Sequence, residues 1–195
     1  EKEVMINEIH HRVKNNLQII DSLLNLQGQH TEHDETKRLV RDTLRRIGAM
    51  ARFHELLYEQ SDLTRISSAE YLRDVLAFFQ TELVRQDGLL SHDIQDAHLD
   101  PGQCMYVGIV MSELVDNAAR RTAGIDGGVT TVHFSATDSV GTLVVHDNGE
   151  SAAPATPIGA DGLSLELVEA LGTQLNGTVV WDYTEGRRCT FQFPR

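Results

Sequence analysis

Residues 8–26 decide the first part of the fold; their sequence is E-I-H-H-R-V-K-N-N-L-Q-I-I-D-S-L-L-N-L. In and around it, apolar side chains recur at spacings of three and four, which predicts a helix that buries one stripe. The stripe consists of Ile6, Ile9, Val13, Leu17, Ile20 and Leu24. Gly28 and the polar run after it predict the end of this helix. His30 and His33 lie in that run, and we interpret them as solvated rather than as metal ligands.

A second periodic segment predicts another helix from about Val40 to Leu57. Two helices joined by a short polar loop form an antiparallel hairpin. Such a hairpin cannot enclose its own apolar stripes, so it either packs on the second domain or pairs with a second copy as a four-helix bundle, and we favour the second option. The sequence therefore predicts a homodimer whose helical domain covers residues 1–62.

The composition changes along the chain, and Gly, Thr, Val and Asp become frequent after Pro101. Ser67 and Glu70 form a capping-box pattern that opens a helix before this point. Helices laid on one face of an antiparallel or mixed sheet predict an α+β sandwich over residues 63–195. Its further predicted elements are a helix over 101–121, a strand pair over 129–136 and 142–147, a helix over 162–175 and a hairpin over 178–183 and 189–194.

Charge and composition exclude several classes of protein. The chain has 29 acidic against 17 basic side chains, a net charge of −12, which argues against binding to nucleic acid or anionic membrane. No apolar run approaches the roughly 20 residues of a membrane span, and the charged N-terminus is no signal peptide, so we expect a cytoplasmic protein. Cys104 and Cys189 lack the spacing of zinc or redox sites and are interpreted as small apolar thiols. P-loop and Rossmann motifs are absent from the sequence.

His11 is the first candidate functional residue. It falls opposite the apolar stripe, and Glu8, His11 and Asn15 share one outward strip because they are spaced three and four residues apart. An exposed imidazole near its own pKa is a competent nucleophile toward phosphorus. Glu8 could orient the ring or take its proton, and Asn15 could position a water. From periodicity alone, a plain surface histidine on a coiled coil remains an alternative.

The second domain contains a matching group of polar residues. In S-E-L-V-D-N-A-A-R-R, Glu113 and Asn117 lie one helical turn apart, and a carboxylate with an amide oxygen suits Mg²⁺. In V-V-H-D-N-G, Asp147 ends a predicted strand, and Gly149 allows the backbone to turn closely around a ligand. Taken alone, each pattern is equally typical of an ordinary helix or turn.

Residues 8–26 resemble the phosphoacceptor box of the bacterial sensor histidine kinases whose signature is H-R-x-K-N-N. The resemblance continues through R-I-G-A-M-A-R-F-H-E-L-L-Y, residues 46–58, which is similar to the second dimerisation helix of that family. It implies that His11 is phosphorylated. It also implies a helical hairpin followed by an ATP-binding α/β sandwich of the Bergerat (GHKL) type.

The resemblance assigns roles in the second domain as well. It implies that Asn117 ligates Mg²⁺ with support from Glu113, and that Asp147 accepts a hydrogen bond from the adenine amino group beside Gly149. Arg120 stands where a basic residue can reach phosphate.

Gly159 to Val168 resembles the last glycine box of the family. There Gly162 and Leu163 would open a helix whose N-terminus favours phosphate. Ser151 and Ser164 stand where the family patterns D-x-G-x-G and G-L-G-L have glycine.

The implied function is ATP-dependent and Mg²⁺-dependent autophosphorylation of His11, followed by transfer of the phosphoryl group to an aspartate of a response regulator. A second hypothesis is a histidine phosphotransferase or adaptor that relays phosphate through His11 without using ATP, and the serines at positions 151 and 164 support it. A third is a dimeric scaffold without phosphoryl chemistry.

Overall fold

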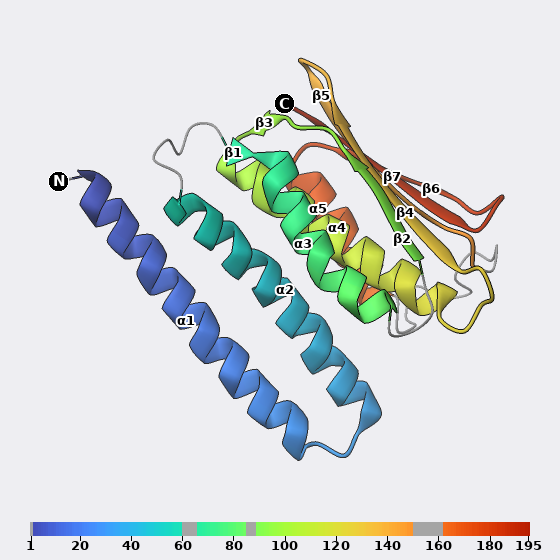
Figure 1. Cartoon of the computed structure of the whole chain (residues 1–195), viewed down its shortest axis with the longest axis horizontal. Helices are drawn as coiled ribbons and strands as arrows, with labels where there is room; N and C mark the ends of the chain where they lie inside the picture. The colour runs from blue at the N-terminus through green and yellow to red at the C-terminus, as the bar shows by residue number, and fades with distance from the viewer. Residues whose placement is uncertain (1, 60–65, 85–88, 150–161) are drawn as a thin grey trace. The chain divides into compact units, whose positions relative to one another are not determined.

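The computed structural model describes residues 2–59, 66–84, 89–149 and 162–195 (Figure 1). The chain divides into two compact units, Glu1–Ile66 and Ser67–Arg195. Each unit is described here by itself. No helix among the described residues is long and apolar enough to cross a membrane.

The first unit consists of two helices, α1 (Lys2–His30) and α2 (Asp34–Glu59), which run side by side in opposite directions (Figure 1). An ion pair joins them, with Lys14 Nζ 2.5 Å from Glu55 Oε1. α1 ends at His30, two residues after Gly28, within the polar run that was predicted to end this helix. A Cβ at Gly28 would lie 3.0 Å from Val40 Cγ1 in α2, so this glycine permits a close approach of the two helices.

The apolar side chains of α1 form two rows. Val13, Leu17 and Leu24 of the predicted stripe are partly covered, whereas Ile20 of the same stripe is 43% exposed. A second, exposed row follows the adjacent side of the helix and consists of Ile19, Leu23 and Leu26. The hairpin therefore leaves apolar surface open along α1.

The second unit contains a five-stranded mixed sheet with the strand order β2-β4-β5-β7-β6. β2 runs parallel to β4, and all other neighbours are antiparallel. The strands are β2 (Leu89–Ile94), β4 (Val129–Ala136), β5 (Val140–Asp147), β6 (Thr178–Asp182) and β7 (Arg187–Pro194), and two short strands are β1 (Ile66–Ser67) and β3 (His98–Leu99). The β4–β5 and β6–β7 hairpins confirm the two predicted strand pairs.

Three helices, α3 (Ser68–Val84), α4 (Pro101–Thr122) and α5 (Gly162–Gln174), cover one face of this sheet (Figure 1). This arrangement confirms the predicted α+β class. Burial alternates along β4, β5 and β7, as it must when one face of a strand meets a helical layer. The buried side chains of these strands include Val132, Phe134, Leu143, Val145, Phe191 and Phe193.

Local signals explain where the helices begin. Asp100 caps α4 by accepting from Gln103 N at 2.9 Å in a capping box, and Pro101 occupies the first turn as predicted. At the start of α3, Glu70 N donates to Ser67 Oγ at 3.3 Å. The cap at Asp100 fixes the start of α4, the helix that carries the predicted polar residues Glu113 and Asn117.

Candidate nucleotide and phosphotransfer site

The middle of α4 buries polar side chains against the sheet. Glu113 is 5% exposed and Asn117 is 4% exposed, one turn apart on the same helix. Burial of a carboxylate and an amide is costly unless both have polar partners. Their placement therefore marks a polar site within an otherwise apolar layer.

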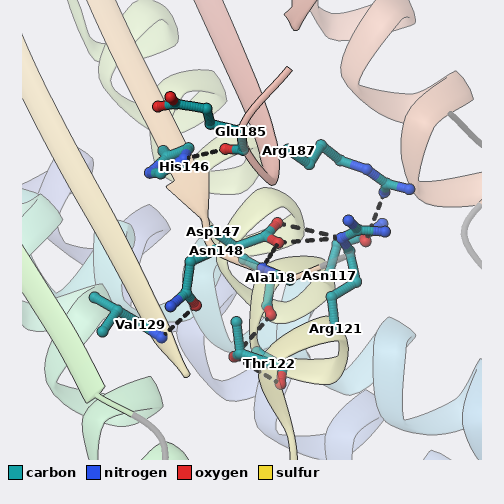
Figure 2. Close-up of polar contacts among 12 residues, drawn as sticks. Asn117, Ala118, Arg121, Thr122, Val129, His146, Asp147, Asn148, Glu185 and Arg187 are labelled. Carbon is teal, nitrogen blue, oxygen red and sulfur yellow. Dashed lines mark hydrogen bonds and ion pairs between the residues drawn. The ribbon is translucent and has the colours of Figure 1, made fainter. Parts of the chain in front are cut away.

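Asp147 reaches this site from the end of β5. Arg121, at the end of α4, donates from Nε to both carboxylate oxygens, at 3.2 Å and 3.3 Å (Figure 2). Gly149 N also donates to Asp147 Oδ1 at 3.0 Å. A Cβ at Gly149 would lie 2.8 Å from Asp147 Oδ1, so this turn requires glycine for the carboxylate to keep its position.

Asn148 fastens the same turn to the start of β4. Its side-chain oxygen accepts from Val129 N at 2.7 Å (Figure 2), and its Nδ2 donates to Gly127 O at 2.9 Å. The backbone immediately after Asp147 is therefore held by hydrogen bonds.

Arg187 is a component of the site that the sequence analysis missed. It is 5% exposed, and its Nη1 donates to Asn117 Oδ1 at 3.0 Å (Figure 2). Gly186, with a φ of +77°, makes the turn that delivers it, and a Cβ there would collide with the backbone oxygen of Asp147. The only local indication of this residue in the sequence was the predicted turn at Glu185-Gly186, which immediately precedes Arg187 and Arg188.

A pocket joins these groups. It is lined by Leu114, Asn117, Ala118, Val145, Asp147, Trp181, Arg187 and Cys189. Asn117 Nδ2 is buried and finds no hydrogen-bond partner among the residues that the structure describes. Burial raises the pKa of Cys189 to about 12, with the Glu169 carboxylate adding to the shift, so this thiol is a small uncharged wall of the pocket.

Arg120 lies on the same helix but pairs with Asp116, one turn earlier. Its side chain is 29% exposed. Arg121, rather than Arg120, contacts the strand end at Asp147. Of the predicted residues, Asn117 and Asp147 line one pocket, Gly149 N donates to Asp147, and Glu113 lies one turn before Asn117 on α4.

In the helical unit, the described side chains flank His11. Glu8 and Arg12 form an exposed ion pair in which Oε1 lies 2.6 Å from Nη2, and Asn15 is exposed. His11 itself lies within α1, and its side chain is outside the described residues.

The predicted phosphate-binding helix begins at Gly162, as expected. The side chains of Leu163 and Ser164 lie outside the described residues, and so does Ser151 as a whole.

The donor set at α4 can be tested for a fit to Mg²⁺. A carboxylate and an amide oxygen one turn apart are ligands of the kind that this hard cation takes. No group of three or more His, Cys, Asp or Glu suited to a metal occurs within the described part of the chain. Glu113 and Asn117 therefore fit an ion that keeps waters and bridges phosphates, and not an ion enclosed by protein ligands alone.

Comparison with known proteins finds relatives in sequence. Residues 8–82 match the family model HisKA_2, described as histidine kinase. The sensor histidine kinase PdtaS of Mycolicibacterium smegmatis is 30% identical over 193 residues, which cover 95% of this chain and 36% of that protein. PdtaS of Mycobacterium tuberculosis is 30% identical over 183 residues, 92% of this chain and 35% of that protein. The chain thus spans about a third of these relatives.

Solved structures show the same fold. The histidine kinase domain of the Erythrobacter litoralis EL346 blue-light activated histidine kinase superposes with a TM-score of 0.70 at 16% identity, covering 99% of this chain and 94% of that one. The catalytic domain of histidine kinase ThkA gives a TM-score of 0.56 at 18% identity over 67% of this chain and 94% of that domain. In sequence the chain is thus similar to sensor histidine kinases, and in fold it is similar to histidine kinase domains.

Proposed function

We propose that the chain is the kinase core of a two-component sensor, which phosphorylates His11 from ATP and passes the phosphoryl group to an aspartate of a response regulator. The observation that carries the proposal is the meeting of Asn117 and Asp147 at one pocket, on the helix and strand that the H-R-x-K-N-N resemblance assigns to ATP. In this proposal residues 1–62 are the phosphotransfer hairpin and residues 63–195 are a GHKL-type ATP-binding domain.

The reaction would be an in-line displacement. A nitrogen of His11 attacks the γ-phosphorus, the new N–P bond forms as the bond to the β,γ-bridging oxygen breaks, and ADP departs. Glu8 would orient the imidazole or take its proton. The exposed pair of Glu8 with Arg12 is weak in water, so it leaves the carboxylate available for this role. Asn15 would position water when the phosphoryl group is later hydrolysed.

In the second domain, the chain's residues would bind and orient the nucleotide. Asp147, held by Gly149 N and Arg121, would accept a hydrogen bond from the adenine amino group. Glu113 and Asn117 would hold Mg²⁺, which when bound neutralises charge on the phosphates. Arg120 and the helix N-terminus at Gly162 and Leu163 would contact phosphate oxygens.

The open apolar row of α1 supports the proposed homodimer. Ile19, Leu23 and Leu26 are each more than half exposed in the single chain. A second copy of the hairpin would cover this row and complete a four-helix bundle.

A decisive test is incubation with Mg²⁺ and γ-labelled ATP. We expect acid-labile, alkali-stable label on the wild-type chain and on His10→Gln, and none on His11→Gln. The His10 variant is the matched control because it removes the neighbouring imidazole. Label that persists in His11→Gln would refute the proposal.

The adaptor function is the second candidate, and one observation favours it. Both predicted ligand groups already have arginine partners, Asn117 with Arg187 and Asp147 with Arg121. An adaptor would accept phosphate on His11 from a phosphorylated regulator while showing no binding of nucleotide by calorimetry. Binding of Mg²⁺·ATP would exclude it.

A further inference from the structure

The guanidinium of Arg187 donates a hydrogen bond to Asn117 Oδ1, the oxygen atom that the proposed metal ion requires as a ligand. We infer that Arg187 and Mg²⁺ compete for Asn117 Oδ1, so that Arg187 blocks the metal position of the nucleotide site until a metal–nucleotide complex displaces it. This inference rests on the proposed function, because it concerns regulation of the same pocket.

The geometry sets the two cations against each other. Nη1 of Arg187 lies 3.0 Å from Asn117 Oδ1, and both residues are at least nine-tenths buried. A magnesium ion binds oxygen at about 2.0–2.1 Å. An amide oxygen has two lone pairs, but two cations at one oxygen repel each other, and a buried site screens that repulsion less than water does. Arg187 in this position therefore weakens metal binding at Asn117.

The state of the amide supports the same conclusion. With Oδ1 engaged by Arg187, the remaining polar atom of Asn117 is Nδ2, which is buried and lacks a partner among the described residues. Nδ2 is a donor and cannot coordinate a cation. Asn117 lines the pocket, but its side-chain oxygen already accepts a hydrogen bond from Arg187. This arrangement is the one in which the metal position is blocked.

Arg187 has a second contact in the same position. Its Cζ lies 5.8 Å from the ring centroid of Tyr183, within the range of a cation–π contact. The Tyr183 ring in turn stacks with Trp181, with centroids 6.5 Å apart. A guanidinium released from Asn117 can remain over Tyr183 without losing every favourable interaction. Displacement of Arg187 would thus disturb the surroundings of Trp181.

Trp181 supplies a measurement of the pocket that does not depend on catalysis. It is the single tryptophan of the chain, and it lines the pocket beside Arg187 and Asn117. Its fluorescence in the full chain can be followed during titration with ATP plus Mg²⁺, and separately with ATP plus EDTA.

We expect Arg187→Met to strengthen binding of Mg²⁺·ATP by about tenfold or more, because a hydrogen bond from a charged donor no longer opposes the metal. Affinity for ATP in EDTA should change by less than twofold. The matched control is Arg188→Met, whose side chain is exposed and adjacent in β7, and which should bind as the wild type does.

Weaker binding by Arg187→Met would overturn the inference, since it would make Arg187 a ligand of the nucleotide. Equal affinities of Arg187→Met and wild type for Mg²⁺·ATP would also overturn it. A Trp181 fluorescence that does not change on titration in either protein would overturn it too. Should Arg187→Met fail to fold, Arg187→Gln gives the second reading. It removes the buried charge but keeps a polar side chain, so it should lower the Mg²⁺ concentration needed for half-maximal binding.

The outcomes separate this inference from the proposed function. Tighter Mg²⁺-dependent binding in Arg187→Met without label on His11 would support the competition and reject the kinase proposal. Label on His11 with unchanged binding in Arg187→Met would do the reverse.

Discussion

Arg121 Nε donates to both carboxylate oxygens of Asp147, and so ties the last turn of α4 to the end of β5. Both side chains are largely buried, at 15% and 3% exposure. Removal of one partner from such a pair leaves a buried charge without compensation. This pair is therefore a structural support as well as part of the candidate site.

We expect Arg121→Met to lower the free energy of unfolding by about 3 kcal/mol, because the Asp147 carboxylate loses its cation. The double variant Arg121→Met/Asp147→Asn should recover part of this loss. Urea unfolding followed by circular dichroism measures both values. Additive losses in the double variant would contradict the coupling.

Gly149→Ala should displace the Asp147 carboxylate, since the new Cβ would meet Oδ1 at 2.8 Å and the backbone oxygen of Arg121 at 3.2 Å. We expect a loss of about 1–3 kcal/mol in stability and weaker nucleotide binding. Gly48→Ala is the control, because nothing lies within 4 Å of a Cβ there and alanine favours the interior of α2. It should stabilise the chain by about 0.5–1 kcal/mol, and a loss at Gly48 equal to that at Gly149 would refute the steric argument.

The two buried thiols predict a dependence of stability on alkaline pH. Burial raises the pKa of both Cys104 and Cys189 from 9.0 to about 12. Between these values the unfolded chain releases protons that the folded chain retains, so stability falls as pH rises above 9, by up to about 1.4 kcal/mol per thiol per pH unit.

The measurement is chemical unfolding of the wild type and of Cys104→Ala/Cys189→Ala at pH 8 and pH 10. The difference in stability between the two pH values should be smaller in the variant, since other groups that titrate in this range are common to both proteins. The same difference in both would show that the thiols titrate normally in the folded state.

The exposed row on α1 predicts a contact between copies. Leu23→Glu should weaken the proposed dimer by about 100-fold or more, because a leucine's burial is lost and a charge enters the interface. Gln27→Glu, an exposed polar position of the same helix, should have little effect. Sedimentation equilibrium gives the dissociation constants, and a wild-type chain that is monomeric at all concentrations would reject the bundle.

The parts of the fold that follow local rules could be predicted from the sequence. Alternating apolar residues predicted the β4–β5 and β6–β7 hairpins, and the proline at position 101 predicted the start of α4. Strand β2 was missed because it lies at the sheet edge and, of its side chains, only Ile94 is buried, so it has no regular alternation. The packing role of Gly28 was not predicted, because it depends on the facing Val40, which local sequence does not reveal.

The candidate site was predicted in the same partial way. Asn117 and Asp147 carry recognisable motifs, and the structure brings both to one pocket. Arg187 lies 70 residues after Asn117, and no local pattern indicates their hydrogen bond. Partners of this kind follow from strand order and register, which are properties of the folded sheet.

The position of β7 has a consequence for the order in which the second unit assembles. It is the last strand of the sequence, yet it lies between β5 and β6 in the sheet and carries Arg187 to the pocket. During translation, β2, β4 and β5 emerge from the ribosome well before the strand that completes the sheet. A nascent chain halted before residue 187 would expose the edge of β5 as an unpaired template, a state that chaperones or aggregation would capture. Until β7 pairs with β5, the pocket lacks its arginine and the sheet keeps an open internal edge, so the pocket and the sheet are completed in the same step.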